Sequence, residues 1–274
     1  MKTIVIATDF SGASNNAALY GVQFAKALNA HVVLFNAYQM PPPPAGINLS
    51  ISQYDIMKIT EQKLKDEADK ISSIHKQYVK IICEEGDAYD AIIKIADELK
   101  ADFIIVGMKG IGKNLKKILG STATKLSRNV HVPLIIVPEE ARFLIPKKIL
   151  YTSDKSLDTN IFSIDQLKSI TEIFNPKLYV IRVVEDEYKE IFEAVHIPNQ
   201  LRKELVKLNT TFHFPINADI NNSIAEFILQ HQIDILIMKP HKHDWIQRIF
   251  KKSKTESMIF HTLIPILILP DFTD

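Results

Sequence analysis

The chain has 274 residues, which is long enough for two domains that each bury a core. Its formal net charge of +1 gives no reason to expect a nucleic-acid partner, and no apolar run approaches the ~20 residues that cross a membrane. The short apolar run at the amino terminus is interrupted by Asp9, so it is not a signal peptide. The only cysteine, Cys83, excludes an intramolecular disulfide and fits a reducing compartment. We therefore expect a cytoplasmic protein with no membrane partner.

The first half alternates short apolar runs with longer amphipathic stretches. The runs predict strands at Thr3 to Ala7, His31 to Tyr38, Val79 to Cys83, Phe103 to Val106 and Leu134 to Val137. The amphipathic stretches predict helices that begin at Ser11 or Ser14, near Ile51, at Asp87 and at Thr122, and end near Asn29, Tyr78, Lys100 and Asn129. This alternation predicts an α/β fold with a mostly parallel, doubly wound, five-stranded sheet and helices on both faces.

A run of four prolines, Pro41 to Pro44, follows the second expected strand. Proline lacks an amide donor and favours an extended conformation, so we expect a stiff loop at the edge of the sheet where ligands bind. The sequence leaves two roles open for this loop, a lid over a ligand or a plain spacer.

Glycines follow the fourth expected strand, at Gly107, Gly110 and Gly120, and Ser121 comes directly after the last of them. Glycine lets a ligand approach the backbone, and the start of a helix offers unpaired N–H groups, so the stretch predicts a phosphate cradle at the sheet edge where α/β proteins bind ligands. Positive charge from Lys109, Lys113, Lys116 and Lys117 lies nearby. The alternative is that the glycines only shape a turn and that Asp9 only caps a helix.

The spacing Gly-x2-Gly-x9-Gly-Ser, followed by the apolar run of residues 132–138, resembles the nucleotide-binding signature of the universal stress protein family. Members with this pattern intact often bind ATP. By position, the resemblance implies a nucleotide site formed by Thr8, Asp9, Ala37, Val106, Gly107, Met108, Gly110, Gly120, Ser121 and Thr122. It implies ATP as the ligand, with AMP or ADP as alternatives, together with Mg or Mn. The fold implied is that of adenine nucleotide alpha hydrolase-like proteins.

The second half repeats the first. The segment ILYTSDKSLDT at residue 149 corresponds to IVIATDFSGAS at residue 4, an offset of 145 residues. The segments DILIMK at 234 and IPILILP at 264 correspond to DFIIVG at 102 and VPLIIVP at 132, an offset of 132. A shortening of 13 residues (145 minus 132) therefore falls between the first and fourth strands.

The repeat predicts two tandem domains, residues 1–140 and 147–274, packed as an intramolecular pseudo-dimer. The resemblance implies that the last strands of the two domains pair, Leu134 to Val137 against Ile266 to Leu269. A further homodimer stays open.

The second copy has lost the glycines of the first. Lys239, Lys242 and Lys252 stand where Gly107, Gly110 and Gly120 stand in the first half. We therefore expect no nucleotide there, but a solvated basic surface or, alternatively, an anion site. His241 and His243 leave a metal site as another alternative, although no spaced carboxylates or cysteines complete it.

The resemblance implies a regulatory protein that binds ATP in its first domain and so controls an unidentified protein partner in the stress response. Two alternatives stay open, an interaction module without nucleotide and a slow ATPase. We do not expect efficient hydrolysis, because the expected cradle has no histidine and no acidic pair beyond Asp9. No catalytic residue and no metal ligand is assigned.

Overall fold

The computed structural model describes residues 1–40, 53–109, 120–129, 131–152, 161–184, 199–217, 219–239 and 264–270. The strands of the first half are β1 (Thr3–Ala7), β2 (His31–Tyr38), β3 (Val79–Glu85), β4 (Phe103–Met108) and β5 (Leu134–Pro138). Its helices are α1 (Gly12–Leu28), α2 (Gln53–His75), α3 (Ala88–Glu98) and α4 (Ser121–Asn129). Each of these elements was predicted. The proline run lies outside the described residues.

Three first-half strands, β3, β4 and β5, are longer than predicted because their pairing continues. Strand β3 stays paired with β2 up to Glu85, opposite Tyr38, and β4 stays paired with β5 up to Met108, opposite Pro138. Gly107, which we expected just beyond the strand, therefore lies within β4.

The second half contributes the strands β6 (Lys148–Thr152), β7 (Lys177–Ile181), β8 (Thr210–His213), β9 (Ile235–Met238) and β10 (Ile266–Ile268). Its helices in the described part of the chain are α5 (Ile161–Phe174), α7 (Asn199–Val206) and α8 (Ile220–His231). No helix in the described ranges is long and apolar enough to cross a membrane.

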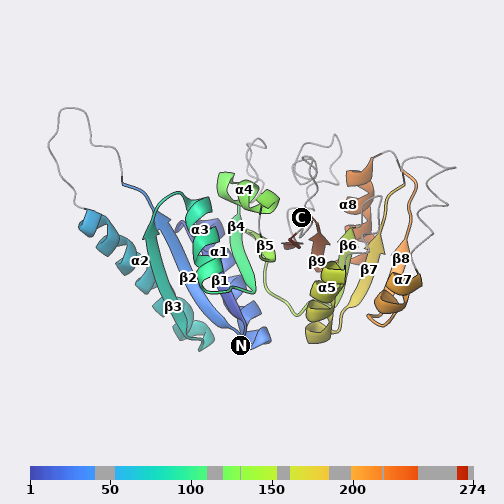
Figure 1. The fold of residues 1–274 in the computed structure, drawn as a ribbon, viewed down its shortest axis with the longest axis horizontal. Helices are drawn as coiled ribbons and strands as arrows, with labels where there is room; N and C mark the ends of the chain where they lie inside the picture. The colour runs from blue at the N-terminus through green and yellow to red at the C-terminus, as the bar shows by residue number, and fades with distance from the viewer. Residues whose placement is uncertain are drawn as a thin grey trace.

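The strands of both halves form one sheet in the order β3-β2-β1-β4-β5-β10-β9-β6-β7-β8 (Figure 1). The pairs within each half are parallel, whereas β5 and β10 run antiparallel, with Ile136 opposite Ile266 and Leu134 opposite Ile268. The predicted pairing of the last strands is confirmed. It joins the two five-stranded sheets that we expected into a single ten-stranded sheet, because two apolar edge strands satisfy each other's backbone groups.

Each face of the sheet has its own core. Ile4 and Ile6 of β1 pack on the face covered by α1, α2 and α5, while Val5 packs on the face covered by α3, α4 and α8. All three residues are fully buried, as expected for a parallel strand covered on both sides. Consecutive residues at the end of β1 therefore point to opposite faces of the sheet.

The two halves pair their strands in the same register. In the first half Ile4 lies opposite Phe103, and in the second half Ile149 lies opposite Ile235. These residues are offset by 145 and 132 (149 minus 4, 235 minus 103), the two offsets read from the sequence.

The register also locates the shortening of the second half. Leu178 in β7 corresponds to Val32 in β2 at an offset of 146, and Thr210 in β8 corresponds to Val79 in β3 at an offset of 131. The second half is therefore 15 residues shorter (146 minus 131) between these strands, in the interval that holds α2 in the first half.

The segment after β5 is fastened to α1 by a buried asparagine. The Nδ2 atom of Asn16 donates to the carbonyl oxygens of Pro138 and Ala141, both at 2.9 Å. Its Oδ1 atom accepts from Nη1 of Arg142 at 2.6 Å. The start of the connection between the halves is thus held against the helix that follows β1.

Candidate functional site

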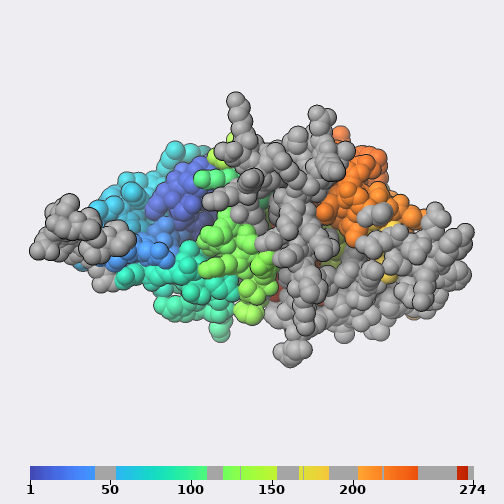
Figure 2. Space-filling view, turned by 90° about the horizontal axis from the view of Figure 1, so that it is seen from above, coloured from blue at the N-terminus to red at the C-terminus, as the bar shows by residue number. Residues whose placement is uncertain are grey.

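A cavity of about 350 Å³ lies at the carboxyl ends of β1, β2 and β4, on the face covered by α3 and α4. Strand β1 lies between β2 and β4, so the connections that leave β1 and β4 run in opposite directions from this point. Such a reversal is where open α/β sheets bind ligands. Figure 2 looks down on this edge, with the first half in blue to green and the second half in orange.

The structure brings most of the predicted site together. The residues of that set that line the cavity are Thr8, Asp9, Ala37, Val106, Gly107, Gly120, Ser121 and Thr122. Met108 does not line it, because its side chain is buried in the core of the α3 and α4 face. Gly110 and the lysines at 113, 116 and 117 lie outside the described residues.

A tight turn after β1 presents Asp9 to the cavity. Phe10 has a φ of 61°, a left-handed conformation that is uncommon outside glycine, and its N–H donates to Oγ1 of Thr8 at 3.0 Å. The Ser11 N–H donates to Oδ1 of Asp9 at 3.0 Å. Loss of solvent would raise the pKa of Asp9, but the hydrogen bonds from Ser11 and Ser14 hold that pKa below its ordinary value. Asp9 is therefore an ionised acceptor at neutral pH.

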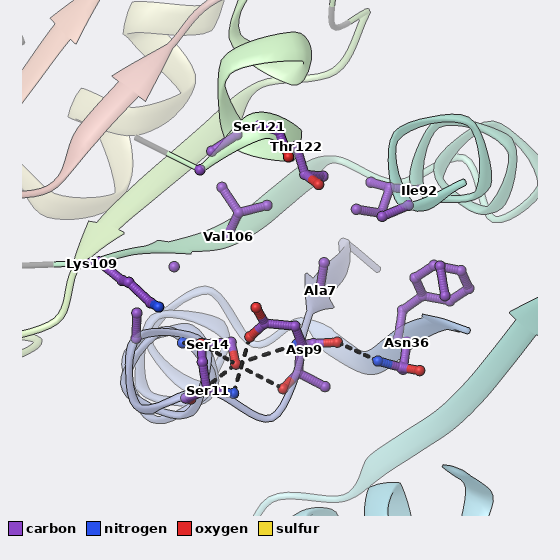
Figure 3. A pocket seen from close by; sticks show the side chains of 18 residues that line it. Ala7, Asp9, Ser11, Ser14, Asn36, Ile92, Val106, Lys109, Ser121 and Thr122 are labelled. Atoms are coloured by element: carbon purple, nitrogen blue, oxygen red, sulfur yellow. Dashed lines mark hydrogen bonds between the residues drawn. The ribbon is translucent and has the colours of Figure 1, made fainter. Parts of the chain in front are cut away.

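The N-cap of α1 is Ser11, whose hydroxyl accepts from the Ser14 N–H at 3.3 Å. The alternative in which Asp9 serves only as the helix cap is therefore wrong. The Asp9 side chain lies between α1 and the opposite wall of the cavity, which carries Ser121 and Thr122 (Figure 3).

The glycines at 107 and 120 have different reasons to be glycine. A Cβ atom on Gly107 would lie 2.5 Å from the carbonyl carbon and oxygen of Ala13 and 2.7 Å from the Ser14 nitrogen. The first turn of α1 thus occupies the space that a side chain at this position would need, so helix packing gives Gly107 a reason to be glycine, while its backbone still lines the cavity. A Cβ atom on Gly120 would have no heavy atom of the described residues within 4 Å, so the described part of the chain leaves space in front of that position.

Two polar residues at the cavity were missed in the sequence: Asn36, which lines it, and Glu67, which lies beneath it. Asn36 is buried, and its Nδ2 atom donates to the Thr8 carbonyl oxygen at 2.7 Å. The Thr8 hydroxyl lies 3.1 Å from Oγ of Ser14 and 3.4 Å from Oε2 of Glu67, which comes from α2 on the other face of the sheet. Glu67 does not line the cavity, so Asp9 is the only carboxylate among the described cavity residues, and Glu67 is an acidic neighbour beneath it.

The location of Glu67 could have been predicted from the sequence of α2. Leu64, Ala68 and Ile71 form the buried stripe of α2, and Glu67 falls on that stripe at helical spacing. Burial raises the pKa of Glu67, the hydrogen bond from Thr8 opposes this rise, and the negative charge of Asp9 adds to it.

The cavity has two chemically different walls. The apolar wall consists of Phe35, Ala37, Ala88, Ile92 and Val106. Lys109 lies across the cavity from Ile92, and Ser121 and Thr122 lie at the first turn of α4 (Figure 3). Among the described residues, no three His, Cys, Asp or Glu side chains gather as a metal site. The cavity therefore suits a ligand with a flat apolar end and an anionic end.

The carboxyl edge of the sheet in the second half differs from that in the first half at Lys239. Lys239, which takes the place of Gly107, is only 6% exposed. The expectation of a solvated basic surface is therefore wrong for this lysine. Lys242, Lys252, His241 and His243 lie outside the described residues.

Comparison with known proteins identifies the class. The model of the universal stress protein family matches residues 1–138. A universal stress protein from Methanocaldococcus jannaschii is 30% identical over 139 residues, covering 50% of this chain and 81% of that protein. The chain therefore belongs to the universal stress protein family.

Solved structures are similar in fold to nearly the whole of this chain. A universal stress protein from Archaeoglobus fulgidus matches with a TM-score of 0.71 at 18% identity, covering 98% of each chain. A universal stress protein in complex with cAMP matches 50% of this chain and 96% of its own at 25% identity and a TM-score of 0.39. At that score its cAMP is a property of that protein and carries no inference for this chain.

Proposed function

We propose that the first half binds an adenine nucleotide, with ATP as the expected ligand, and that the bound nucleotide controls contact with a protein partner in the stress response. One observation carries the proposal, a cavity at the reversal point of the sheet with an apolar wall and a donor-rich wall. Its volume of about 350 Å³ falls within the range of roughly 300–1,000 Å³ found for ligand pockets.

The apolar wall suits a purine base. Ala37 at the end of β2 and Ile92 on α3 line this part of the cavity, together with the ring of Phe35. Burying a flat ring there removes apolar surface from water at both partners. The ionised carboxylate of Asp9 is placed beside this wall as an acceptor for a sugar hydroxyl.

The opposite wall suits phosphates. The Gly120 carbonyl, directly before α4, accepts the Thr124 N–H at 2.9 Å as the first hydrogen bond of the helix, so the N–H groups of Ser121, Thr122 and Ala123 have no partner within the helix. Unpaired N–H groups and the positive end of a helix attract anions, and no atom of the described residues near a Gly120 Cβ takes up the space that an anion would need. A bound Mg or Mn ion would be held through the phosphates, since the described residues offer no cluster of three acidic or histidine ligands.

We also propose that the two halves, residues 1–140 and 147–274, are two copies of one domain that form an internal pseudo-dimer. The equal strand registers and the antiparallel pairing of β5 with β10 support this. The second copy would supply part of the surface that a protein partner reads. Pairing into a larger homodimer is left to measurement.

The alternative of an interaction module without nucleotide gains support from Gly107, because helix packing alone explains that glycine. Gly120 has no such explanation and favours a ligand. A slow ATPase gains no support, since Asp9 is the only carboxylate among the described cavity residues and no histidine lines the described cavity.

The test begins with freshly purified protein, denatured so that any released nucleotide can be identified by mass, followed by calorimetric titration with ATP, ADP and AMP. Gly120→Val should leave the melting temperature of the free protein unchanged and weaken ATP binding at least about tenfold, because the added side chain fills the open space in front of α4. Lys109→Gln should weaken binding less.

The matched control is Lys65→Gln, which removes an exposed lysine of α2, away from the cavity. It should bind ATP as the unmodified protein does. A wild-type protein that carries no nucleotide and is not stabilised by ATP at about 100 times any plausible Kd, where about 2.7 kcal/mol is expected, would favour the interaction module instead.

A further inference from the structure

We propose that Glu67 is a positioning residue beneath the cavity and that it takes up a proton when the nucleotide binds. The inference rests on the proposed function and adds a form of regulation to it. Nucleotide affinity would depend on pH through a side chain that does not line the cavity.

Glu67 is built into the support of the cavity floor. It lies on the buried stripe of α2, and its Oε2 atom is 3.4 Å from the Thr8 hydroxyl. Thr8 lines the cavity, and its Oγ1 atom accepts the Phe10 N–H at 3.0 Å. Glu67 therefore supports the turn that holds Asp9 against the ligand space.

The second carboxyl oxygen of Glu67 is the unusual feature. Oε1 is buried and has no hydrogen-bond partner among the described residues. A carboxylate with one buried oxygen and no donor to it is poorly stabilised, whereas the neutral acid carries no full charge to stabilise. The site is thus built for a carboxyl group that can change its protonation state.

The surrounding charges act in opposite directions. Burial raises the pKa of Glu67, and Asp9 in the turn after β1 raises it further, while Lys70 on α2 lowers it. The neighbours from α1 and β2, Ser14 and Asn36, are uncharged. An anionic ligand in the cavity brings further negative charge near the Asp9 turn and disfavours the ionised form of Glu67 further.

Binding and protonation are therefore linked with a defined sign. A proton from solvent joins the Glu67 carboxylate as the nucleotide binds, and no other bond changes. Because the bound state holds more protons than the free state, ATP affinity rises as the pH falls through the range in which Glu67 titrates.

The experiment measures ATP binding by calorimetry between pH 6 and pH 8 in buffers of different ionisation enthalpy, which gives the number of protons taken up. ATP itself titrates in this range, so the wild-type protein is compared with Glu67→Gln, which keeps the shape and cannot take a proton. The affinity gain from pH 8 to pH 6 should be about threefold larger in the wild type, which is a further rise of about half a pKa unit on binding.

Two more variants separate the coupling from general effects. Asp69→Asn removes an exposed carboxylate from the same helix and should take up protons as the wild type does. Glu67→Leu removes the acceptor for Thr8 and should weaken ATP binding about threefold to tenfold at every pH, while Glu67→Gln stays within about twofold of the wild type at pH 6.

Equal proton uptake in the wild type and Glu67→Gln would overturn the inference, as would an equal loss of uptake in Asp69→Asn. Those results leave ATP binding itself intact and so leave the proposed function standing. Absence of ATP binding in the wild type at every pH would overturn the proposed function and the coupling together.

Discussion

Strands β4 and β9 hold equivalent places in the two halves, with equal registers against their neighbours, yet the chain continues differently at their ends. In β4 the glycine at 107 lets the first turn of α1 pack directly against the strand. After β9 the equivalent residue is the buried Lys239. Lysine carries a Cβ atom, which the contact between Gly107 and Ala13 in the first half has no room for. The close packing of α1 on the first half of the sheet thus depends on a glycine at this position.

The first helix of each half also differs at one polar position. Asn16 of α1 is buried and fastens the segment after β5 with hydrogen bonds to two carbonyl oxygens. At the offset of 145 its counterpart is Ile161, the first residue of α5, and isoleucine has no side-chain donor. An isoleucine side chain cannot make the hydrogen bonds by which Asn16 holds the segment after β5 in the first half.

The largest effect is expected for Asn16→Ala. The change removes the hydrogen bonds to Pro138, Ala141 and Arg142 and leaves buried polar atoms without partners, so the free energy of unfolding should fall by about 3 kcal/mol. Guanidinium denaturation measures it. Asn15→Ala, at an exposed position on the same helix, should change stability by less than about 0.5 kcal/mol. If Asn16→Ala and Asn15→Ala lost equal amounts of unfolding free energy, the hydrogen bonds of Asn16 would not stabilise the first half.

A smaller effect is expected for Gly107→Ala, which gives the first half the Cβ that Lys239 gives the second. The added carbon would clash with backbone atoms of α1, so we expect a loss of about 2 kcal/mol. Gly120→Ala, whose new carbon meets no atom of the described residues within 4 Å, should stay within about 0.5 kcal/mol of the wild type in the same denaturation experiment. If both alanines were tolerated equally, α1 would not need the glycine.

The sequence predicted the elements of the first half well because their signals are local. Alternating apolar runs marked the strands, and Ser11 and Asp87 marked the helix starts that they cap. Most of the site followed as well, because the carboxyl ends of parallel strands share one edge, which brings Asp9 and Ala37 to one cavity.

The remaining features depend on tertiary packing. The contact between Gly107 and Ala13 depends on how closely α1 docks on the sheet, and the contact between Thr8 and Glu67 joins residues 59 positions apart through the rotation of α2 about its axis. Neither contact can be predicted from a local sequence pattern. Glycine spacing therefore predicted residues that line the cavity but did not reveal that Gly107 also has a packing role against α1.

The smallest effect concerns the outer strand of the second half. His213 in β8 corresponds to Ile82 in β3, because the former lies opposite Ile181 and the latter opposite Phe35. Burial lowers the pKa of His213, and the charges of His231 and Lys177 lower it further. A histidine with a lowered pKa in the folded state binds fewer protons than in the unfolded chain, so stability should fall as the pH drops through about 6.5.

The measurement compares unfolding at pH 7.5 and pH 5.5 in the wild type and in His213→Ile, which copies the first-half residue. Because His213 is only partly buried and solvent screens its neighbours, the pH-dependent loss removed by the substitution should be below about 1 kcal/mol. His31→Gln, at an exposed histidine of β2, should keep the wild-type pH dependence. A His213→Ile protein that loses stability with acid as the wild type does would place the acid sensitivity elsewhere and leave the two outer strands equivalent in this respect.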